Sequence, residues 1–157
     1  MNNNKTIFST KEFKNWSERG NLLPEEQILI EKYLNKNLNS VEAGTASGRI
    51  LLEMYQLGFK SLFGYDFVSE FIHIAKKRDR ANSIVFSVQD ATNLNYSDAS
   101  FDQAIYLQQI ISTIEDPLKR VKSLQEAFRI LKKNGIVLFS FLSFESIISV
   151  CVAFPVP

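Results

Sequence analysis

The order of hydrophobic and polar residues predicts two helices in the first part of the chain. Residues 9–12 have the spacing of a capping box, and Phe13 and Trp16 follow three residues apart, which predicts a short helix. Pro24, followed by two glutamates, is typical of a second helix start. We therefore expect residues 1–39 to form N-terminal helices that pack on or cap a site in the rest of the chain.

From residue 40 onward, short apolar runs alternate with longer segments of helical periodicity. This alternation is typical of repeated βαβ units and a parallel sheet. We expect strands near 40–42, 61–65, 83–88, 101–107 and 136–142. The pattern predicts one doubly wound, Rossmann-like α/β domain over residues 40–157, with a mostly parallel sheet and helices on both faces.

The last predicted helix begins at Asp116-Pro117 and ends at Asn134-Gly135. Its apolar residues recur at helical spacing, and we expect them to face the sheet. They are Leu118, Val121, Leu124, Phe128 and Leu131.

Composition favours one domain with a small or neutral partner. The 157 residues are 45% apolar, and 18 basic residues balance 17 acidic ones. This charge balance provides no electrostatic footprint for nucleic acid or for an anionic membrane. Cys151 is the single cysteine, and no apolar run approaches the roughly 18 residues of a spanning helix. We expect a cytoplasmic protein with no metal site.

A glycine-containing loop, EAGTASGR, follows the first predicted strand from Glu42 to Arg49. Its small residues let a ligand approach the backbone and leave the N–H groups of the next helix free. A tight strand-to-helix turn explains the same residues, so the loop alone does not distinguish a ligand-binding site from a structural turn.

Carboxylates follow the next two strands, and the carboxyl ends of parallel strands meet at one edge of a sheet. Asp66, twenty-two residues after Gly44, can accept hydrogen bonds from both hydroxyls of a ribose, or it can cap a helix. Asp90 can accept from an exocyclic adenine amine while the next N–H donates to a ring nitrogen. Its alternative is an Asx-type turn.

Four motifs in this order, EAGTASGR, GYDF, VQDATNLNYSDASFD and EAFRILKKNGIVLFS, resemble the class I S-adenosylmethionine-dependent methyltransferases. The resemblance covers about residues 40–144 and is greatest to the small-molecule, ubiquinone-biosynthesis-like branch. It implies S-adenosylmethionine as cofactor and a small-molecule methyl acceptor. It also implies that Glu42 and the loop Gly44, Thr45, Ala46 and Gly48 face the methionine part, Asp66 the ribose, Phe67, Asp90 and Ala91 the adenine, and Gln108 the methyl-transfer cavity.

Two departures from the family pattern affect these expectations. The family loop has a glycine where this chain has Ala46, and a methyl group there is tolerable only if φ is not positive. We therefore expect weakened cofactor binding. The family sheet has seven strands, and the segment 143–157 is too short for a helix and two strands, so we expect a C-terminally truncated sheet that lacks the last two. Alternating Val150, Val152 and Phe154 can cover the edge of the fifth strand, with Pro155 at the end.

Two alternatives remain at this point. A nicotinamide-dependent oxidoreductase also has a glycine loop and a later acid, but its fingerprint needs a small residue where Arg49 stands. A methyltransferase-like protein that binds the cofactor without catalysis is the other. The sequence assigns no catalytic residue, since His73 belongs to the helix after the second strand, away from the expected cleft.

Overall fold

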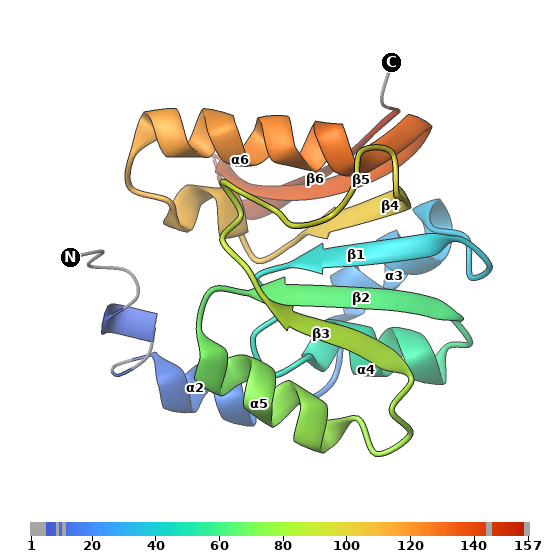
Figure 1. Cartoon of the computed structure of the whole chain (residues 1–157), viewed down its shortest axis with the longest axis vertical. Helices are drawn as coiled ribbons and strands as arrows, with labels where there is room; N and C mark the ends of the chain where they lie inside the picture. The colour runs from blue at the N-terminus through green and yellow to red at the C-terminus, as the bar shows by residue number, and fades with distance from the viewer. Residues whose placement is uncertain (1–5, 9, 11, 144–145, 156–157) are drawn as a thin grey trace.

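The computed structural model describes residues 6–8, 10, 12–143 and 146–155. Its centre is a six-stranded sheet in the order β3-β2-β1-β4-β5-β6 (Figure 1). The strands are β1 (Asn39–Ala43), β2 (Ser61–Asp66), β3 (Ile84–Val88), β4 (Phe101–Tyr106), β5 (Leu131–Ser143) and β6 (Ser146–Pro155). The first five are parallel, and the order reverses between β1 and β4. Such a reversal leaves a crevice at the carboxyl ends of these strands.

Helices cover both faces of the sheet (Figure 1). They are α2 (Phe13–Glu18), α3 (Pro24–Tyr33), α4 (Arg49–Gln56), α5 (Ser69–Arg78), the 3₁₀ turn η1 (Ile110–Thr113) and α6 (Pro117–Ile130). One apolar cluster joins α3, α4 and α5 to the sheet through residues such as Ile30, Met54 and Ile72. A second cluster, with Ala127 and Ile130, lies under α6. The expected doubly wound α/β fold is confirmed.

The segment 143–157 adds a strand to the sheet. Strand β6 pairs antiparallel with β5, with Phe154 opposite Val137 and Val152 opposite Phe139. Pro155 is its last residue. The expectation that this segment covers the edge of the fifth strand is therefore confirmed, and the described sheet has one strand beyond the five parallel ones.

The N-terminal helix α2 begins one residue after the segment 9–12. Glu12 stands at its N-cap and makes no side-chain capping bond. Ser9, the expected N-cap of the capping box, and Lys11 lie outside the described residues. Helix α3 starts at Pro24 as expected, with Glu25 and Glu26 in its first turn.

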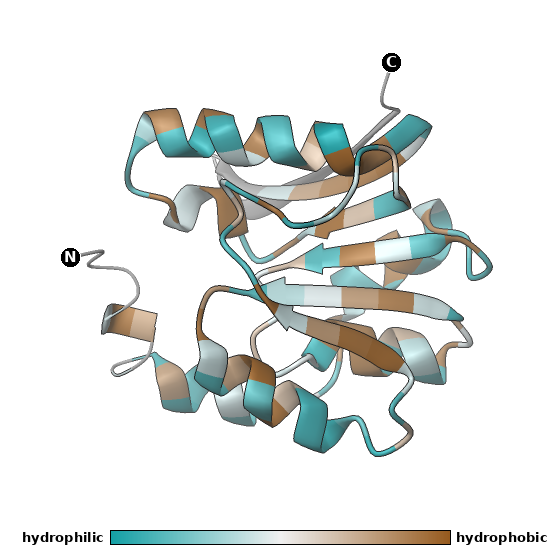
Figure 2. Cartoon of the chain, viewed as in Figure 1, coloured by the Kyte–Doolittle hydropathy of each residue, from teal (hydrophilic) through white to brown (hydrophobic). Residues whose placement is uncertain are grey.

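The expected apolar face of α6 is wrong at three of its five positions, whereas Leu131 is buried and the partly buried Leu124 packs against the second cluster. Leu118, Val121 and Phe128 are 80%, 52% and 43% exposed, and the hydropathy colouring shows apolar and polar bands alternating along this helix (Figure 2). The buried side chains are Ser123, Glu126, Ala127 and Ile130. A charged residue can face the interior here because Glu126 has hydrogen-bond partners for both carboxylate oxygens. The helix also ends at Ile130, earlier than expected, and the next residue already belongs to β5.

Candidate cofactor-binding site

A cleft of about 700 Å³ opens at the carboxyl ends of β1, β2 and β4. A smaller cavity of about 380 Å³ adjoins it and shares part of its wall. Of the residues expected at the site, seven line the cleft: Glu42, Gly44, Thr45, Ala46, Asp66, Phe67 and Gln108. Ala91 lines only the smaller cavity. Gly48 and Asp90 line neither.

Glu42, near the end of β1, is buried in the wall of the cleft. Its carboxylate accepts a hydrogen bond from the Thr45 hydroxyl at 2.6 Å. Burial raises the pKa of Glu42 to about 7, although the Thr45 hydrogen bond and the nearby Arg49 act in the opposite direction. A cation that enters the cleft would stabilise the ionised form of this carboxyl group.

Asp66 ends β2 and joins the two loops that border the cleft. One carboxylate oxygen accepts from the Ala46 N–H at 3.0 Å and the other from the Val68 N–H at 2.9 Å. Burial raises the pKa of Asp66 to about 6, against these backbone hydrogen bonds. Its carboxylate therefore fixes the glycine-containing loop relative to the start of α5, which begins just after Val68.

Three residues of the loop have positive φ: Gly44 at 63°, Ala46 at 45° and Gly48 at 79°. A Cβ atom at Gly44 would overlap the Ile110 side chain, and one at Gly48 would lie 2.8 Å from Cζ of Phe86. Gly48 thus serves the packing of α4 on the sheet. Ala46 fails the condition stated for it, because its backbone has the left-handed conformation that side chains disfavour.

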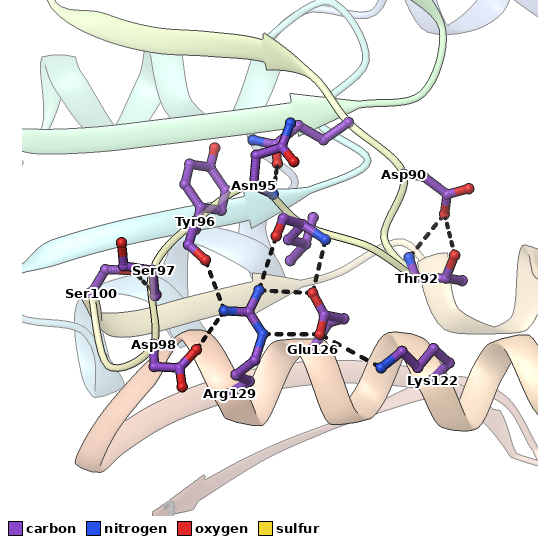
Figure 3. A network of polar contacts seen from close by, with 12 residues as sticks. Asp90, Thr92, Asn95, Tyr96, Ser97, Asp98, Ser100, Lys122, Glu126 and Arg129 are labelled. Atoms are coloured by element: carbon purple, nitrogen blue, oxygen red, sulfur yellow. Dashed lines mark hydrogen bonds and ion pairs between the residues drawn. The ribbon is translucent and has the colours of Figure 1, made fainter.

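Asp90 is exposed, and its carboxylate accepts from the N–H and the hydroxyl of Thr92, both at 2.8 Å (Figure 3). This is the Asx-type turn given above as the alternative. The sequence therefore located the turn, while the carboxylate itself lies outside the lining of both cavities.

An arginine on α6 holds the rest of this β3–β4 loop (Figure 3). Arg129 donates to the carbonyl oxygens of Leu94 and Tyr96 at 2.9 and 2.8 Å, and to both oxygens of Glu126. Glu126 also accepts from the Leu94 N–H at 2.8 Å. The hydrogen bonds from Arg129 lower the pKa of Glu126 to about 2. Asp98 adds an exposed ion pair at 2.7 Å.

A buried ion pair, which the sequence analysis missed, connects the N-terminal helices to the cleft. Arg49, the first residue of α4, donates to both oxygens of Glu26 at 2.6 and 2.8 Å. Glu26 also accepts from Gln108 at 2.5 Å, and Gln108 accepts from Arg19 at 3.1 Å. Burial raises the pKa of Glu26, but the hydrogen bonds from Arg49 and Leu23 outweigh it and the net shift is downward. A signal was present, because a cation at a helix N-terminus opposes the dipole unless a carboxylate neutralises it.

Residues before α3 also contribute to the cleft, and the sequence analysis named none of them as site residues. Phe8, Trp16 and Arg19 line it. The Trp16 carbonyl accepts from the Ser47 hydroxyl at 2.8 Å, so α2 is bonded to the glycine-containing loop. Phe13 stacks on Phe71 of α5 with ring centroids 5.0 Å apart. A tryptophan and a phenylalanine one helical turn apart were the available signal.

No group of three or more His, Cys, Asp or Glu side chains among the described residues is arranged to hold a metal ion. No helix in the described part of the chain is long and apolar enough to cross a membrane.

Solved structures of S-adenosylmethionine-dependent methyltransferases are similar to this chain in both fold and sequence. An S-adenosylmethionine-dependent methyltransferase from Methanosarcina mazei is 29% identical, with a TM-score of 0.66, over 76% of this chain and 57% of its own. A structure from Thermotoga maritima, described as an S-adenosylmethionine-dependent methyltransferase and possible histamine N-methyltransferase, is 28% identical, with a TM-score of 0.68, over 92% of this chain and 63% of its own. The cyclase SpnF, 23% identical with a TM-score of 0.65 over 73% of this chain and 42% of its own, shows the fold alone.

The chain spans less than two thirds of the length of each of these three structures. No curated protein matches it significantly. The sequence model of a methyltransferase domain family matches residues 41–139, which include the glycine-containing loop, Glu42, Asp66, most of β1 and all of β2 to β4. On this match over more than half of its length, the chain belongs to the methyltransferase domain family.

Proposed function

We propose that the chain binds S-adenosylmethionine in the cleft and transfers its methyl group to a small-molecule acceptor. The observation that carries this proposal is the pair of buried carboxylates, Glu42 and Asp66, in the wall of a cleft around Gly44. Similarity to S-adenosylmethionine-dependent methyltransferases at 28% and 29% identity supports it.

The residues present fit this cofactor. S-adenosylmethionine is cationic at its sulfonium and its ammonium group, and two carboxylates of raised pKa favour a positive ligand. Gly44 borders the cleft with a φ of 63°, a backbone conformation that side chains disfavour. The family pattern assigns Glu42, Thr45 and Ala46 to the methionine part and Asp66 to the ribose, and we retain these assignments as proposals.

For the base, we propose the region between Phe67 and Ala91, which both line the smaller cavity. A planar ring in this cavity would lie next to the cleft, because Gly44, Asp66 and Phe67 line both. Asp90 reaches the base only if its Asx turn opens.

The cofactor, when bound, supplies an electrophilic methyl group, so the chain has to align the acceptor and exclude water. Positioning of this kind lowers a barrier by roughly 7–11 kcal/mol. Phe8 and Trp16 form apolar parts of the wall, and Gln108 is fixed between Glu26 and Arg19 at its edge. We propose that residues 1–39 cap the cofactor and shape the acceptor site.

Separate isothermal titrations with S-adenosylmethionine and with NAD test the proposal. We expect binding of the first and none of the second. Asp66→Asn keeps the size of the side chain and removes its charge, and we expect at least tenfold weaker binding, about 1.4 kcal/mol. Asp79→Asn is the matched control, since Asp79 is equally buried but bonds Ile84 and Ser83 outside the cleft.

Transfer itself requires a second experiment, because the fold supports other activities and SpnF is a cyclase. S-adenosylmethionine tritiated in its methyl group is incubated with the chain and a panel of small phenols, amines and carboxylic acids. Label in an extracted acceptor supports the proposal. Binding of the cofactor without transfer to any acceptor instead supports the catalytically inactive alternative.

A further inference from the structure

Arg19 differs from the other arginine in the wall of the cleft. Arg49 is buried, and it donates to both oxygens of Glu26 and to the Asn21 carbonyl. Arg19 follows the last residue of α2, lines the same cleft and is exposed. No carboxylate in the described part of the chain lies within ion-pair distance of its guanidinium. Arg19 is therefore the arginine of this wall that is open to a ligand.

The guanidinium of Arg19 is held in place by uncharged groups. It lies over the Trp16 ring, 5.0 Å from the ring centroid, and this contact uses none of its N–H donors. Nη1 donates to the Gln108 amide oxygen at 3.1 Å, and the Arg19 carbonyl accepts from Arg78 at 3.2 Å. A guanidinium has five N–H donors in a planar fork. One bond to an amide leaves donors for a carboxylate, which such a fork binds through two parallel hydrogen bonds.

The cleft carries opposite charges at two depths. Glu42 and Asp66 are 4% and 5% exposed, and they favour the cationic groups of S-adenosylmethionine. Arg19 is exposed and bonds Gln108, which follows β4, so it lies at the outer edge of the cleft. A second ligand that enters after the cofactor meets this edge first. An anionic group is favoured beside Arg19 and disfavoured beside the buried acids.

Most of the remaining wall is apolar and partly aromatic. It includes Phe8, Trp16, Phe71 and Ile110. Apolar walls with a few placed polar groups are typical of small-molecule sites. A ligand suited to this part of the cleft has an apolar body and one acidic group.

We propose that the methyl acceptor is a small carboxylic acid and that Arg19 binds its carboxylate. This inference rests on the proposed function, because it takes the cleft as the place of methyl transfer, and it narrows the acceptor to one chemical class. In this arrangement the carboxylate orients the acceptor at the edge of the cleft, and the apolar walls enclose the rest of the molecule.

Isothermal titration of the chain saturated with S-adenosylhomocysteine tests the proposal. The probes are benzoate, salicylate, phenylacetate and hexanoate, each compared with its primary amide, which keeps the shape and lacks the charge. We expect acids to bind about tenfold more tightly than their amides, because two charge-assisted hydrogen bonds are lost in the amide. Arg19→Met removes the charge and should abolish this preference. Arg19→Lys keeps the charge without the fork and should retain part of it.

Arg80→Met is the matched control. Arg80 is also an exposed arginine, but it follows α5 and lines neither cavity. The affinities of this variant for the acids and for the amides should equal those of the unaltered chain.

A second pair of ligands separates the acceptor from the cofactor, whose methionine part also has a carboxylate. S-adenosylhomocysteine contains this carboxylate, and methylthioadenosine lacks it. We expect Arg19→Met to bind both as tightly as the unaltered chain does. Weaker binding of S-adenosylhomocysteine with unchanged binding of methylthioadenosine would assign Arg19 to the cofactor and overturn the inference.

Two further outcomes also overturn the inference. Equal affinity of the unaltered chain for every acid and its amide removes the anion site. A preference for acids that persists in Arg19→Met places the carboxylate elsewhere. If the unaltered chain binds neither S-adenosylmethionine nor S-adenosylhomocysteine, the proposed function itself fails. A chain that binds the cofactor without preferring acids contradicts only the inference, so the two failures are distinguishable.

Discussion

Two arginines bond segments next to the two cavities, Arg49 beside the cleft and Arg129 beside the smaller cavity, in different environments. Arg49 bonds Glu26 in the interior, where the side chains are 7% and 4% exposed. Arg129 bonds Glu126 closer to the surface, because the Glu126 side chain is 8% exposed but the arginine is 30% exposed and its second partner, Asp98, is 78% exposed. Both make two hydrogen bonds to a glutamate, so the pairs differ mainly in their access to water.

This difference determines what each pair does for the site. A buried charge that loses its partner has no water to replace it, so the N-terminal helices and the glycine-containing loop depend on each other. At the surface, water can satisfy Asp98 and part of Arg129, and salt screens the pair. The α3 side is therefore expected to be rigid, and the β3–β4 loop to adjust more readily to a ligand.

Breaking the buried pair has the largest expected effect. Arg49→Met leaves Glu26 buried and charged, and we expect the free energy of unfolding to fall by about 3–5 kcal/mol. Denaturant unfolding monitored by circular dichroism measures this loss. The matched control is Glu26→Met with Arg49→Met, which removes both charges and should recover most of the stability. A single variant as stable as the parent chain would show that the pair contributes nothing.

Breaking the contacts of Arg129 with Glu126 and Asp98 is expected to have a smaller effect, because this arginine is partly open to water. Arg129→Met removes donors from the Leu94 and Tyr96 carbonyls, and we expect a loss of about 1.5–3 kcal/mol with weaker cofactor binding. Asp98→Ala removes only the exposed partner, and we expect about 0.2–1 kcal/mol, reduced further by salt. Equal losses for Arg129→Met and Arg49→Met would contradict the comparison.

The sequence predicted the sheet and the position of the cleft because both follow from local patterns. The strand periodicity located β2 and β3 to within one residue, and the turn residues located the loops. Asp66 was recognisable because it directly follows an apolar strand. Its hydrogen bond to Ala46 was not, since that contact joins two loops across the sheet edge.

Long-range polar contacts account for what the sequence missed. Glu26 and Arg49 are 23 positions apart and belong to different helices, so the spacing within either helix does not indicate the pair. The burial of α6 was misjudged for a related reason. Glu126 occupies a buried position because Arg129 and Leu94 bond its carboxylate, and this placement turns Val121 and Phe128 outward. Periodicity of apolar residues cannot show that a glutamate has partners.

The pH dependence of binding tests the buried side of the cleft further. Burial raises the pKa of Glu42 from 4.5 to about 7 and that of Asp66 from 3.8 to about 6. Their protonation therefore stabilises the ligand-free protein below about pH 4, and this contribution is lost as the pH rises through 6 and 7. Cofactor binding should change in the opposite direction, by up to about tenfold per pH unit, because a cationic ligand favours the ionised carboxylates.

Titration calorimetry with S-adenosylmethionine from about pH 5.5 to 7.5, paired with melting curves of the ligand-free chain, measures both trends. Glu42→Gln should flatten the upper part of the affinity profile. An affinity that is constant over this range would show that neither carboxylate changes its ionisation on binding. Glu126 provides an internal comparison, because its pKa is held near 2 and its carboxylate stays ionised throughout this pH range.

The smallest expected effect comes from the strained residue of the glycine-containing loop. Ala46 has a φ of 45°, and replacing it with glycine removes a left-handed conformation that costs an alanine about 1 kcal/mol. Glycine also loses more backbone entropy on folding, which offsets part of that gain. We expect Ala46→Gly to raise the melting temperature slightly and to strengthen cofactor binding by up to about fivefold, since the methyl group borders the cleft.

Ala99→Gly is the matched control, because Ala99 has a φ of 50° in an exposed turn before β4, outside both cavities. A gain in stability for both variants with a gain in affinity for Ala46→Gly alone would assign the second effect to the ligand, and no gain in affinity would show that the cofactor leaves room for the methyl group.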